Sequence, residues 1–154
     1  MPGAGFYALH TSKLSFRSDG RWYADDDPVV HERLARLFSR YLRRTPAGGF
    51  EIWIDERYHA DVEVEDTPYV VTTVDGDPAA GFSIDLNDGT TEALDPKTLH
   101  VGRGDVLYCR VKDGRERARF LRPAYYQLAH FIEETAPGRF QLRCGGTTCP
   151  IERV

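Results

Sequence analysis

Hydrophobic and polar residues alternate along much of the chain, most regularly on either side of Asp113-Gly114. Alternation with a period of two is typical of β-strands that bury one face. An Asp-Gly pair between two such runs favours a two-residue hairpin turn, because a type I′ turn needs positive φ at both central residues. Counting outward from this turn places Arg110 opposite Arg117 and Tyr108 opposite Arg119. The pattern therefore predicts an antiparallel hairpin with a defined register.

The two faces of this predicted hairpin differ in composition. One face holds mostly core-type residues, namely Leu107, Cys109, Val111, Glu116, Ala118 and Phe120. The other, which we call the arginine face, holds Tyr108, Arg110, Lys112, Arg115, Arg117 and Arg119. Directly opposed like charges destabilise a sheet by about 0.2–1 kcal/mol per pair. We therefore expect an anionic ligand, an acidic partner protein or an acidic surface of the same chain to cover this face. The alternative is a solvated face on which the arginines splay apart.

Two stretches have apolar residues at helical spacing. The first helix is expected near residues 28–44, because Asp25–Pro28 offers an N-cap and a proline at the first helical position. Thr45–Gly49 would end it. The second helix is expected near residues 123–134 and begins at Pro123.

The remaining alternating runs predict strands and turns. Strands are expected at Phe6–Ser18, Phe50–Ile54, Asp61–Glu65, Pro68–Val74, Phe82–Leu86 and Thr90–Leu94. Turns are expected at Asp75–Pro78 and Asn87–Gly89, where Asp, Asn, Gly and Pro cluster. Many strands with two helices indicate an α+β fold.

The end of the chain repeats the order of its beginning. Thr135–Phe140 matches Thr45–Phe50 at an offset of 90 residues, and apolar positions of the two helices coincide at this offset. Asp113-Gly114-Arg115 also echoes Asp19-Gly20-Arg21, which would leave about five extra residues between turn and helix in the first copy. We interpret this as a duplicated hairpin–helix–hairpin unit; the alternative is a chance similarity of two amphipathic units.

The repeat predicts how the chain is organised. We expect two small antiparallel sheets, each packed by one helix, with a hairpin starting at Phe50 in one unit and at Phe140 in the other. Residues 1–66 would form the first β-α-β unit. Residues 67–154 would form a second unit with extra strands, tightly packed on the first because no low-complexity linker separates them.

Length and charge fit an ordinary globular protein. The chain has 154 residues and a formal net charge of −4. No stretch approaches the roughly 20 apolar residues that span a bilayer. Met1–Gly5 lack the charged start and apolar segment of a secretory signal, so a cytoplasmic location is expected.

Three cysteines argue against a disulfide framework. Cys109 lies on the core face of the hairpin. Cys144 and Cys149 flank a Gly-Gly-Thr-Thr turn and would face each other across it, either as a reversible redox pair or as two buried small residues. No spacing of Cys and His residues offers a zinc site. We expect no metal and no cofactor.

Known catalytic motifs are missing from the sequence, so no catalytic residues are assigned. His59-Ala60-Asp61 would place an imidazole and a carboxylate on one strand face, where an exposed ion pair is the simpler interpretation. Glu63, Glu65 and Asp66 follow on an acidic strand. These carboxylates are the candidate internal counter-charge for the arginine face.

Four segments of the chain resemble a known bacterial family. They are D-G-R-W-Y (Asp19–Tyr23), R-L-F-S-R-Y-L-R-R (Arg36–Arg44), V-E-V-E-D-T-P-Y-V-V (Val62–Val71) and L-Y-C-R-V…A-R-F-L-R-P-A-Y-Y-Q-L (Leu107–Leu128). They are similar to proteins of domain-of-unknown-function family 1285, and equally to those of the related family 4505. The resemblance covers nearly the whole chain.

The resemblance to family 1285 carries several expectations. It implies a duplicated α+β core whose second half looks like a pleckstrin-homology domain. It also implies a ligand site at the interdomain interface, for a nucleotide-like molecule, and a role in signal transduction. It supplies no catalytic residues. The second unit of this chain is shorter than the family pattern, which puts a full pleckstrin-like barrel in question.

These observations favour a non-enzymatic ligand-sensing or interaction protein that binds an anionic small molecule, at the arginine face or between the units. The first alternative is an enzyme acting on a phosphorylated or carboxylated metabolite, with His59, Tyr126 or Cys109 as the reactive group. The second is an RNA-binding module, in which tyrosines stack on bases, although the negative net charge makes nucleic acid an unlikely partner. The sequence leaves the oligomeric state open.

Overall fold

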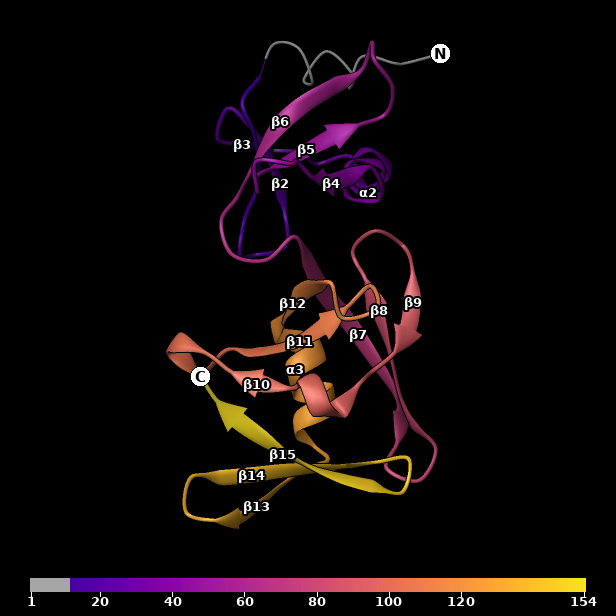
Figure 1. Cartoon of the computed structure of the whole chain (residues 1–154), viewed down its shortest axis with the longest axis vertical. Coiled ribbons are helices and arrows are strands. Elements are labelled where there is room, and N and C mark those ends of the chain that lie inside the picture. Colours follow the sequence, from indigo (N-terminus) through magenta and orange to yellow (C-terminus); the bar gives the residue numbers. More distant parts are fainter. Residues whose placement is uncertain (1–11) are drawn as a thin grey trace. The chain divides into compact units, whose positions relative to one another are not determined.

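Two compact units make up the protein, and the division between them falls between Pro68 and Tyr69. The computed structural model describes residues 12–154 (Figure 1). The expectation for Met1–Gly5, and the Phe6–Thr11 part of the strand expected at Phe6–Ser18, lie outside the described residues. No helix in residues 12–154 is long and apolar enough to cross a membrane.

The described residues form a mostly-β α+β fold with two mixed sheets, of six and nine strands, and two short α-helices. The expectation of purely antiparallel sheets is wrong. In each unit the last strand lies parallel to an earlier strand, with Val62 opposite Leu14 in the first unit and Glu152 opposite His100 in the second. Parallel neighbours need a long crossover connection, which the intervening helix and strands supply.

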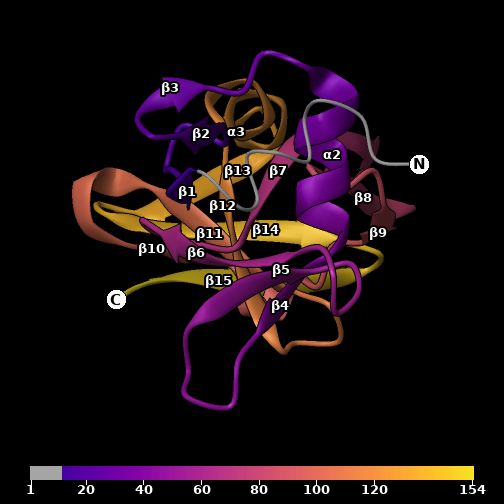
Figure 2. The same ribbon diagram turned by 90° about the horizontal axis from the view of Figure 1, so that it is seen from above.

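The first unit has its six strands and one helix in a simple order. They are β1 (Leu14–Phe16), β2 (Trp22–Ala24), β3 (Asp27–Pro28), α2 (Glu32–Arg40), β4 (Leu42–Arg44), β5 (Phe50–Trp53) and β6 (His59–Val64). The sheet order is β3-β2-β1-β6-β5-β4. The helix α2 lies beside β4 and β5 of its own sheet in both views (Figures 1 and 2).

The helix α2 begins four residues later than predicted, because Asp25 and Asp26 form a turn instead of a helix cap. Both have positive φ, 49° and 72°, a conformation that aspartate tolerates better than most residues. The turn pairs Ala24 with Asp27 and makes β2 and β3 a short hairpin. The helix then begins at Glu32 without a side-chain cap.

Both helices end earlier than predicted, because the residues that follow join a sheet. Leu42 on β4 pairs with Ile52 on β5. In the second unit Ile132 pairs with Leu142 in the same way. Leu42 and Ile132 fit the apolar spacing of a helix and also that of a strand, so the sequence pattern alone did not separate the two.

Aromatic side chains form the centre of the first unit. The ring of Trp22 lies 5.1 Å from that of Phe16 and 5.4 Å from that of Phe38. The indole Nε1 donates a hydrogen bond of 2.9 Å to Oγ of Ser39, and both residues are buried. A buried tryptophan N–H needs such an acceptor, so Ser39 completes this core.

The second unit contains nine strands, one α-helix and two short 3₁₀ helices. They are β7 (Tyr69–Asp77), β8 (Gly81–Leu86), β9 (Thr91–Ala93), η2 (Pro96–Thr98), β10 (His100–Val101), η3 (Arg103–Asp105), β11 (Leu107–Val111), β12 (Glu116–Phe120), α3 (Arg122–Ala129), β13 (Ile132–Ala136), β14 (Arg139–Cys144) and β15 (Thr147–Arg153). The sheet order is β13-β14-β15-β10-β11-β12-β7-β8-β9.

The turn expected at Asp75–Pro78 lies further along the chain, because β7 continues to Asp77. Gly76 has a φ of 122°, and a Cβ at this position would lie only 2.2 Å from the carbonyl oxygen of Gly81. The glycine therefore lets β7 and β8 approach closely. The turn itself follows at Pro78–Ala80, where Oδ1 of Asp77 accepts hydrogen bonds from the next backbone amides.

The register predicted for the β11–β12 hairpin is confirmed. Tyr108 lies opposite Arg119, Cys109 opposite Ala118, Arg110 opposite Arg117 and Val111 opposite Glu116. The connecting turn has positive φ at three consecutive residues, Lys112, Asp113 and Gly114. The hairpins predicted to start at Phe50 and Phe140 are also present, as β5–β6 and β14–β15.

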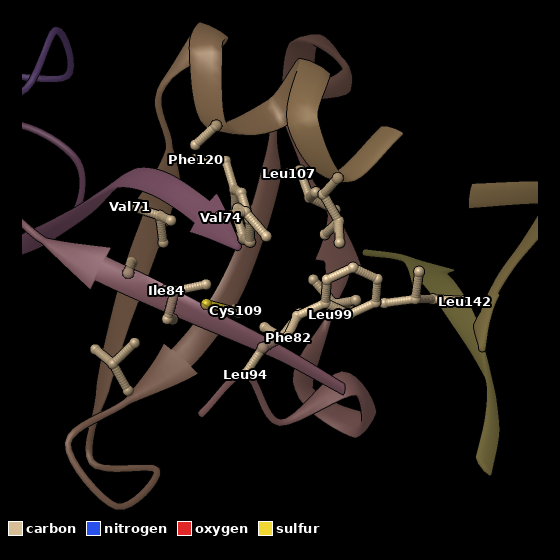
Figure 3. Close-up of a cluster of buried hydrophobic side chains, with 14 of the residues drawn as sticks. Val71, Val74, Phe82, Ile84, Leu94, Leu99, Leu107, Cys109, Phe120 and Leu142 are labelled. Carbon is tan, nitrogen blue, oxygen red and sulfur yellow. The ribbon is translucent and has the colours of Figure 1, made fainter. Parts of the chain in front are cut away.

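One hydrophobic core fills the second unit (Figure 3). Leu107, Cys109 and Phe120 of the hairpin point into it together with Val71 and Ile84, and α3 packs against β7 and β12. The sheet curls strongly around this core. The curl brings β9, the last strand in the sheet order, close to the end of β11. Glu92 on β9 therefore accepts a hydrogen bond from the backbone N–H of Lys112, the residue that follows β11.

The two sheets share an order of strands and the same backbone contacts. The order β4-β5-β6-β1-β2 in one corresponds to β13-β14-β15-β10-β11 in the other. In the first, Arg17 donates its backbone N–H to the carbonyl of Arg21 at 3.0 Å. In the second, Gly102 donates to Val106 at 2.8 Å across the matching turn.

This order corrects the sequence match between Asp113-Gly114-Arg115 and Asp19-Gly20-Arg21. Asp19-Gly20 lies between β1 and β2, whereas Asp113-Gly114 lies between β11 and β12. The turn that corresponds to Asp19-Gly20 in the strand order is Gly102–Val106. The longer segment before the helix is therefore in the second unit, where β11 and β12 extend well beyond the short β2–β3 pair.

We expect Ser39→Ala to lower the free energy of unfolding of the first unit by about 1–3 kcal/mol, because it leaves the buried indole N–H of Trp22 without this acceptor. Both tryptophans, Trp22 and Trp53, lie in the first unit, so denaturant unfolding followed by tryptophan fluorescence reports on that unit. Ser18→Ala is the matched control. Equal midpoints for the two variants would show that Ser39 contributes nothing.

Candidate functional site

The six residues of the arginine face lie in several different environments in the structure. Arg117 folds onto Tyr108 in the middle of the hairpin. Arg110 and Arg115 line a pocket at its end. The ammonium group of Lys112 is engaged elsewhere. Arg119, opposite Tyr108, is half-buried and has contacts of its own within the protein.

Arg117 and Tyr108 form a stack that also contains a residue the sequence did not indicate, His100. The guanidinium carbon of Arg117 lies 4.3 Å from the centre of the Tyr108 ring. The imidazole of His100 stacks on the same tyrosine, with ring centres 5.5 Å apart and planes inclined by 15°. Nη2 of Arg117 lies 3.3 Å from Nε2 of His100. Three strands, β10, β11 and β12, contribute one residue each.

The hydrogen bonds of His100 determine which ring nitrogen carries its proton. Nδ1 lies 2.9 Å from the carbonyl oxygen of Thr98, which can only accept. Nδ1 is therefore the protonated nitrogen. Arginine has donors only, so Nε2 must accept from Arg117, and the imidazole in this arrangement is neutral.

Gly102 leaves space for the ring of Tyr108. A Cβ at this position would lie 2.8 Å from Cε2 of Tyr108, closer than such atoms approach in proteins. The φ of Gly102 is −104°, so its need for glycine comes from this close approach and not from a left-handed backbone. The absence of a side chain at residue 102 leaves space for the Tyr108 ring, against which His100 and Arg117 both pack.

Lys112 does not share the face predicted for it. Its φ of 56° breaks the alternation of the strand, and its ammonium lies 5.0 Å from the centre of the Tyr69 ring, which packs against the core. Nζ donates to Oδ2 of Asp88 at 2.6 Å and to Oγ1 of Thr90 at 3.0 Å. The lysine charge is thus neutralised by a buried carboxylate.

Burial and hydrogen bonds act in opposite directions on Asp88. Burial of this carboxylate, which is 6% exposed, would raise its pKa. The hydrogen bonds from Lys112 and Thr90 outweigh burial and hold the pKa of Asp88 below its usual range. The nearby Tyr69 is affected differently, because its burial and the Asp88 charge raise the pKa of its phenol to about 12.

A pocket of about 570 Å³ lies between the end of the β11–β12 hairpin and β9 with the segment that follows it. It is lined by Glu92, Ala93, Asp95, Thr98, Arg110, Lys112, Asp113, Gly114 and Arg115. Arg110 and Arg115 are exposed on it. The sequence predicted these two arginines as site residues, but the acidic side of the pocket was not predicted.

Two of the carboxylates in this pocket already have backbone partners. Glu92 accepts from the backbone N–H of Lys112, with both oxygens at 3.3 Å. Asp95 accepts from the backbone N–H of Lys97 at 3.1 Å. Within residues 12–154 no carboxylate forms an ion pair with Arg110 or Arg115; Nε of Arg115 donates to the carbonyl of Lys112 instead. The two guanidinium groups remain available to a ligand.

A second hollow, of about 260 Å³, lies in the first unit, but its charges are paired with one another. Its lining residues are Lys13, Ser15, Arg17, Asp25, Asp26, Glu63 and Glu65. Lys13 pairs with Glu63 at 3.0 Å, and Arg17 pairs with Asp26 at 2.6 Å. The backbone N–H of Ser18 donates to Glu65. Glu63 and Glu65, the expected counter-charges of the arginine face, thus have partners in their own unit.

The cysteine pair was predicted wrongly in one respect. Cys144 lies opposite Thr147, and Cys149 lies opposite Leu142, so the two cysteines are diagonal neighbours and not directly opposed. The Gly145-Gly146 turn sets this register. Both thiols are free and buried. No group of His, Cys, Asp and Glu side chains in the described part of the chain could hold a metal ion.

The three reactive groups considered for an enzyme have separate environments. Cys109 is fully buried, and burial, with smaller effects of Glu92 and Asp95, raises the pKa of its thiol to about 12. His59 stacks on Trp53 at 4.5 Å in the first unit. Tyr126 is 62% exposed on α3. None of them lines the 570 Å³ pocket.

No protein-family model matches the sequence, and no curated protein matches it. The fold is similar to that of a DUF1285 family protein from Silicibacter pomeroyi DSS-3, with a TM-score of 0.70 and 18% identity over 98% of this chain and 90% of that one. A DUF1285 family protein from Shewanella baltica OS155 is similar with a TM-score of 0.59 and 19% identity, over 78% of this chain and 92% of that one. The predicted resemblance to family 1285 is confirmed as a likeness of fold; that to family 4505 stays a prediction.

We expect Asp88→Asn to lower the free energy of unfolding at neutral pH by about 1–3 kcal/mol, because Lys112 loses its charged acceptor. Since the folded state holds the pKa of Asp88 below its unfolded value, the carboxylate stabilises the fold above about pH 4. This contribution disappears as pH falls toward the folded pKa. The difference between wild type and variant should therefore shrink in acid, as calorimetry at several pH values would measure. Asp113→Asn, at an exposed position, is the control; a pH-independent difference would contradict the linkage.

Proposed function

We propose that the second unit binds a small anionic molecule in the 570 Å³ pocket and acts as a non-enzymatic ligand-sensing or interaction module. The observation that carries this proposal is the pair of exposed guanidinium groups, Arg110 and Arg115, that line the pocket without a carboxylate partner among residues 12–154. Guanidinium groups bind phosphate and carboxylate oxygens through two parallel hydrogen bonds. The pocket volume lies within the range of small-molecule sites, about 300–1,000 Å³.

The charges around the pocket support an anion there. Asp88 neutralises the third cation, Lys112, and so fixes the turn that carries Arg115. Glu92 and Asp95 accept backbone hydrogen bonds, which weakens their attraction for the arginines. A ligand anion would therefore bring the counter-charge that the predicted site lacks.

Two features favour binding without catalysis. Cys109, His59 and Tyr126 do not line the pocket. The pocket is also open, and its arginines are always charged, so they can hold an anion but cannot themselves accept a proton from a substrate. The enzyme and RNA-binding alternatives, and a role in signalling, stay predictions.

Arg110→Gln combined with Arg115→Gln should weaken anion binding at least tenfold, because each charged hydrogen bond contributes about 1.5–3 kcal/mol. We would measure binding by calorimetry and thermal shift with a panel of phosphate monoesters, dicarboxylates and sulfate at constant ionic strength. Arg21→Gln combined with Arg139→Gln changes the net charge equally at exposed positions outside the pocket. The proposal is wrong if no anion binds the wild type, or if both double variants lose affinity alike.

We also infer that the two units are copies of one ancestral unit. The same strand order and the parallel pairing of β1 with β6 and of β10 with β15 support this inference. So does the pairing of Leu42 with Ile52 and of Ile132 with Leu142. Backbone contacts coincide as well, since Glu65 donates to Phe16 at 3.0 Å and Val154 to Val101 at 2.9 Å. The pleckstrin-like character of the second half stays a prediction.

A crystal structure would test the duplication directly. Residues 32–53 and 122–143 should superpose at an offset of 90 with a deviation well below the strand spacing of about 4.8 Å. If superposition needs another offset for the helix than for the strands that follow it, the repeat has arisen by chance.

A further inference from the structure

The contact between Arg117 and His100 uses few of the N–H donors of the guanidinium group. A guanidinium has five N–H donors, and within residues 12–154 its nitrogen contact is with Nε2 of His100 alone. The ring of Tyr108 covers one of its faces. Arg117 is only half-buried, so an anion can reach the remaining donors. Arg117 and His100 do not line the 570 Å³ pocket.

The charge of His100 depends on what Arg117 binds. A neutral Nε2 accepts from the guanidinium, and a proton on this nitrogen would set two donors against each other at 3.3 Å. An oxyanion bound to Arg117 reverses the situation, because its oxygens are acceptors and a protonated Nε2 can donate to them. Nδ1 keeps its hydrogen bond to Thr98 in both states.

We propose that Arg117 and His100 form a second anion subsite, which binds an oxyanion such as a phosphate or sulfate group together with one proton. The proton comes from the solvent and is taken up by Nε2 as the hydrogen bond from Arg117 is replaced. The imidazolium and the guanidinium then hold two oxygens of the anion, with the Tyr108 ring beneath them. This subsite goes beyond the pocket proposed above and does not depend on it.

The charges around His100 agree with an imidazole that becomes charged only when an anion binds. The positive charge of Arg117 lies against the imidazole, with Nη2 3.3 Å from Nε2. The exposed carboxylate of Glu152 lies opposite His100 across β10–β15. The adjoining segments also carry Tyr108, Arg110, Glu116, Arg119, Arg153, Lys97, Arg103 and Asp105. An oxyanion on Arg117 would cancel the guanidinium charge beside the ring.

Sulfate is the probe that tests this subsite, since its own charge is constant between about pH 5.5 and pH 8, where histidines titrate. Its affinity would be measured by NMR from the ring signals of His100, against sodium chloride of equal ionic strength. Binding that takes up one proton should weaken by up to about tenfold for each pH unit above the titration of the ring. The His100 signals should move to the protonated position as sulfate is added.

Variants separate this subsite from the pocket. His100→Gln should bind sulfate without pH dependence, and Arg117→Gln should lose this binding at every pH. If His100→Gln does not fold, His100→Asn keeps a donor toward Thr98 and serves instead. His130→Gln, at an exposed histidine of the second unit, should behave as wild type.

The outcomes are distinct for the two sites. Sulfate affinity that is independent of pH in the wild type, or His100 signals that do not respond to sulfate, would overturn the subsite. The combined Arg110→Gln and Arg115→Gln variant should retain the pH-dependent binding. If it loses this binding together with its other anion affinity, the oxyanion sits in the pocket and the subsite is wrong, while the proposed function stands.

Discussion

The register of the β11–β12 hairpin is the constraint on which both proposed anion sites depend. It places Arg110 directly opposite Arg117, and two like charges in this position cost about 0.2–1 kcal/mol. Arg117 avoids this cost by lying over the Tyr108 ring at 4.3 Å, a contact that contributes about 0.5–2 kcal/mol. The gain is as large as the repulsion or larger, so the two arginines separate. Arg117 joins His100, and Arg110 lines the pocket with Arg115.

Local signals in the sequence predicted local structure well. The Asp113-Gly114 turn gave the pairing of the hairpin residue by residue, because the turn conformation alone sets that register. Helix ends were predicted less well, since Leu42 and Ile132 suit a helix and a strand equally. The parallel pairing of β1 with β6 and of β10 with β15 had no local signal. It arises from contacts between segments about 50 residues apart in sequence.

In the candidate site, too, local sequence signals predicted some positions, and contacts between distant segments were missed. Alternation placed Tyr108, Arg110 and Arg117 on one face correctly, but Lys112 left that face because its φ is positive. His100 was missed, since it lies on a strand of only two residues and meets Arg117 through a neighbouring strand. Gly102 was not singled out either, because its role is to leave space for the ring of Tyr108, which only the assembled sheet reveals.

The negative net charge of the chain is a poor guide to what this surface binds. In the second unit, Asp88 pairs with Lys112, Glu133 with Arg143 and Asp105 with Arg153. These pairs cancel locally, and at distances beyond about 8–10 Å their remaining fields are screened by salt. What a ligand meets near the hairpin is therefore set by the guanidinium groups that no carboxylate holds. Because the acids of the first unit's hollow are also paired internally, a chain with a charge of −4 can still present guanidinium groups that have no carboxylate partner among residues 12–154.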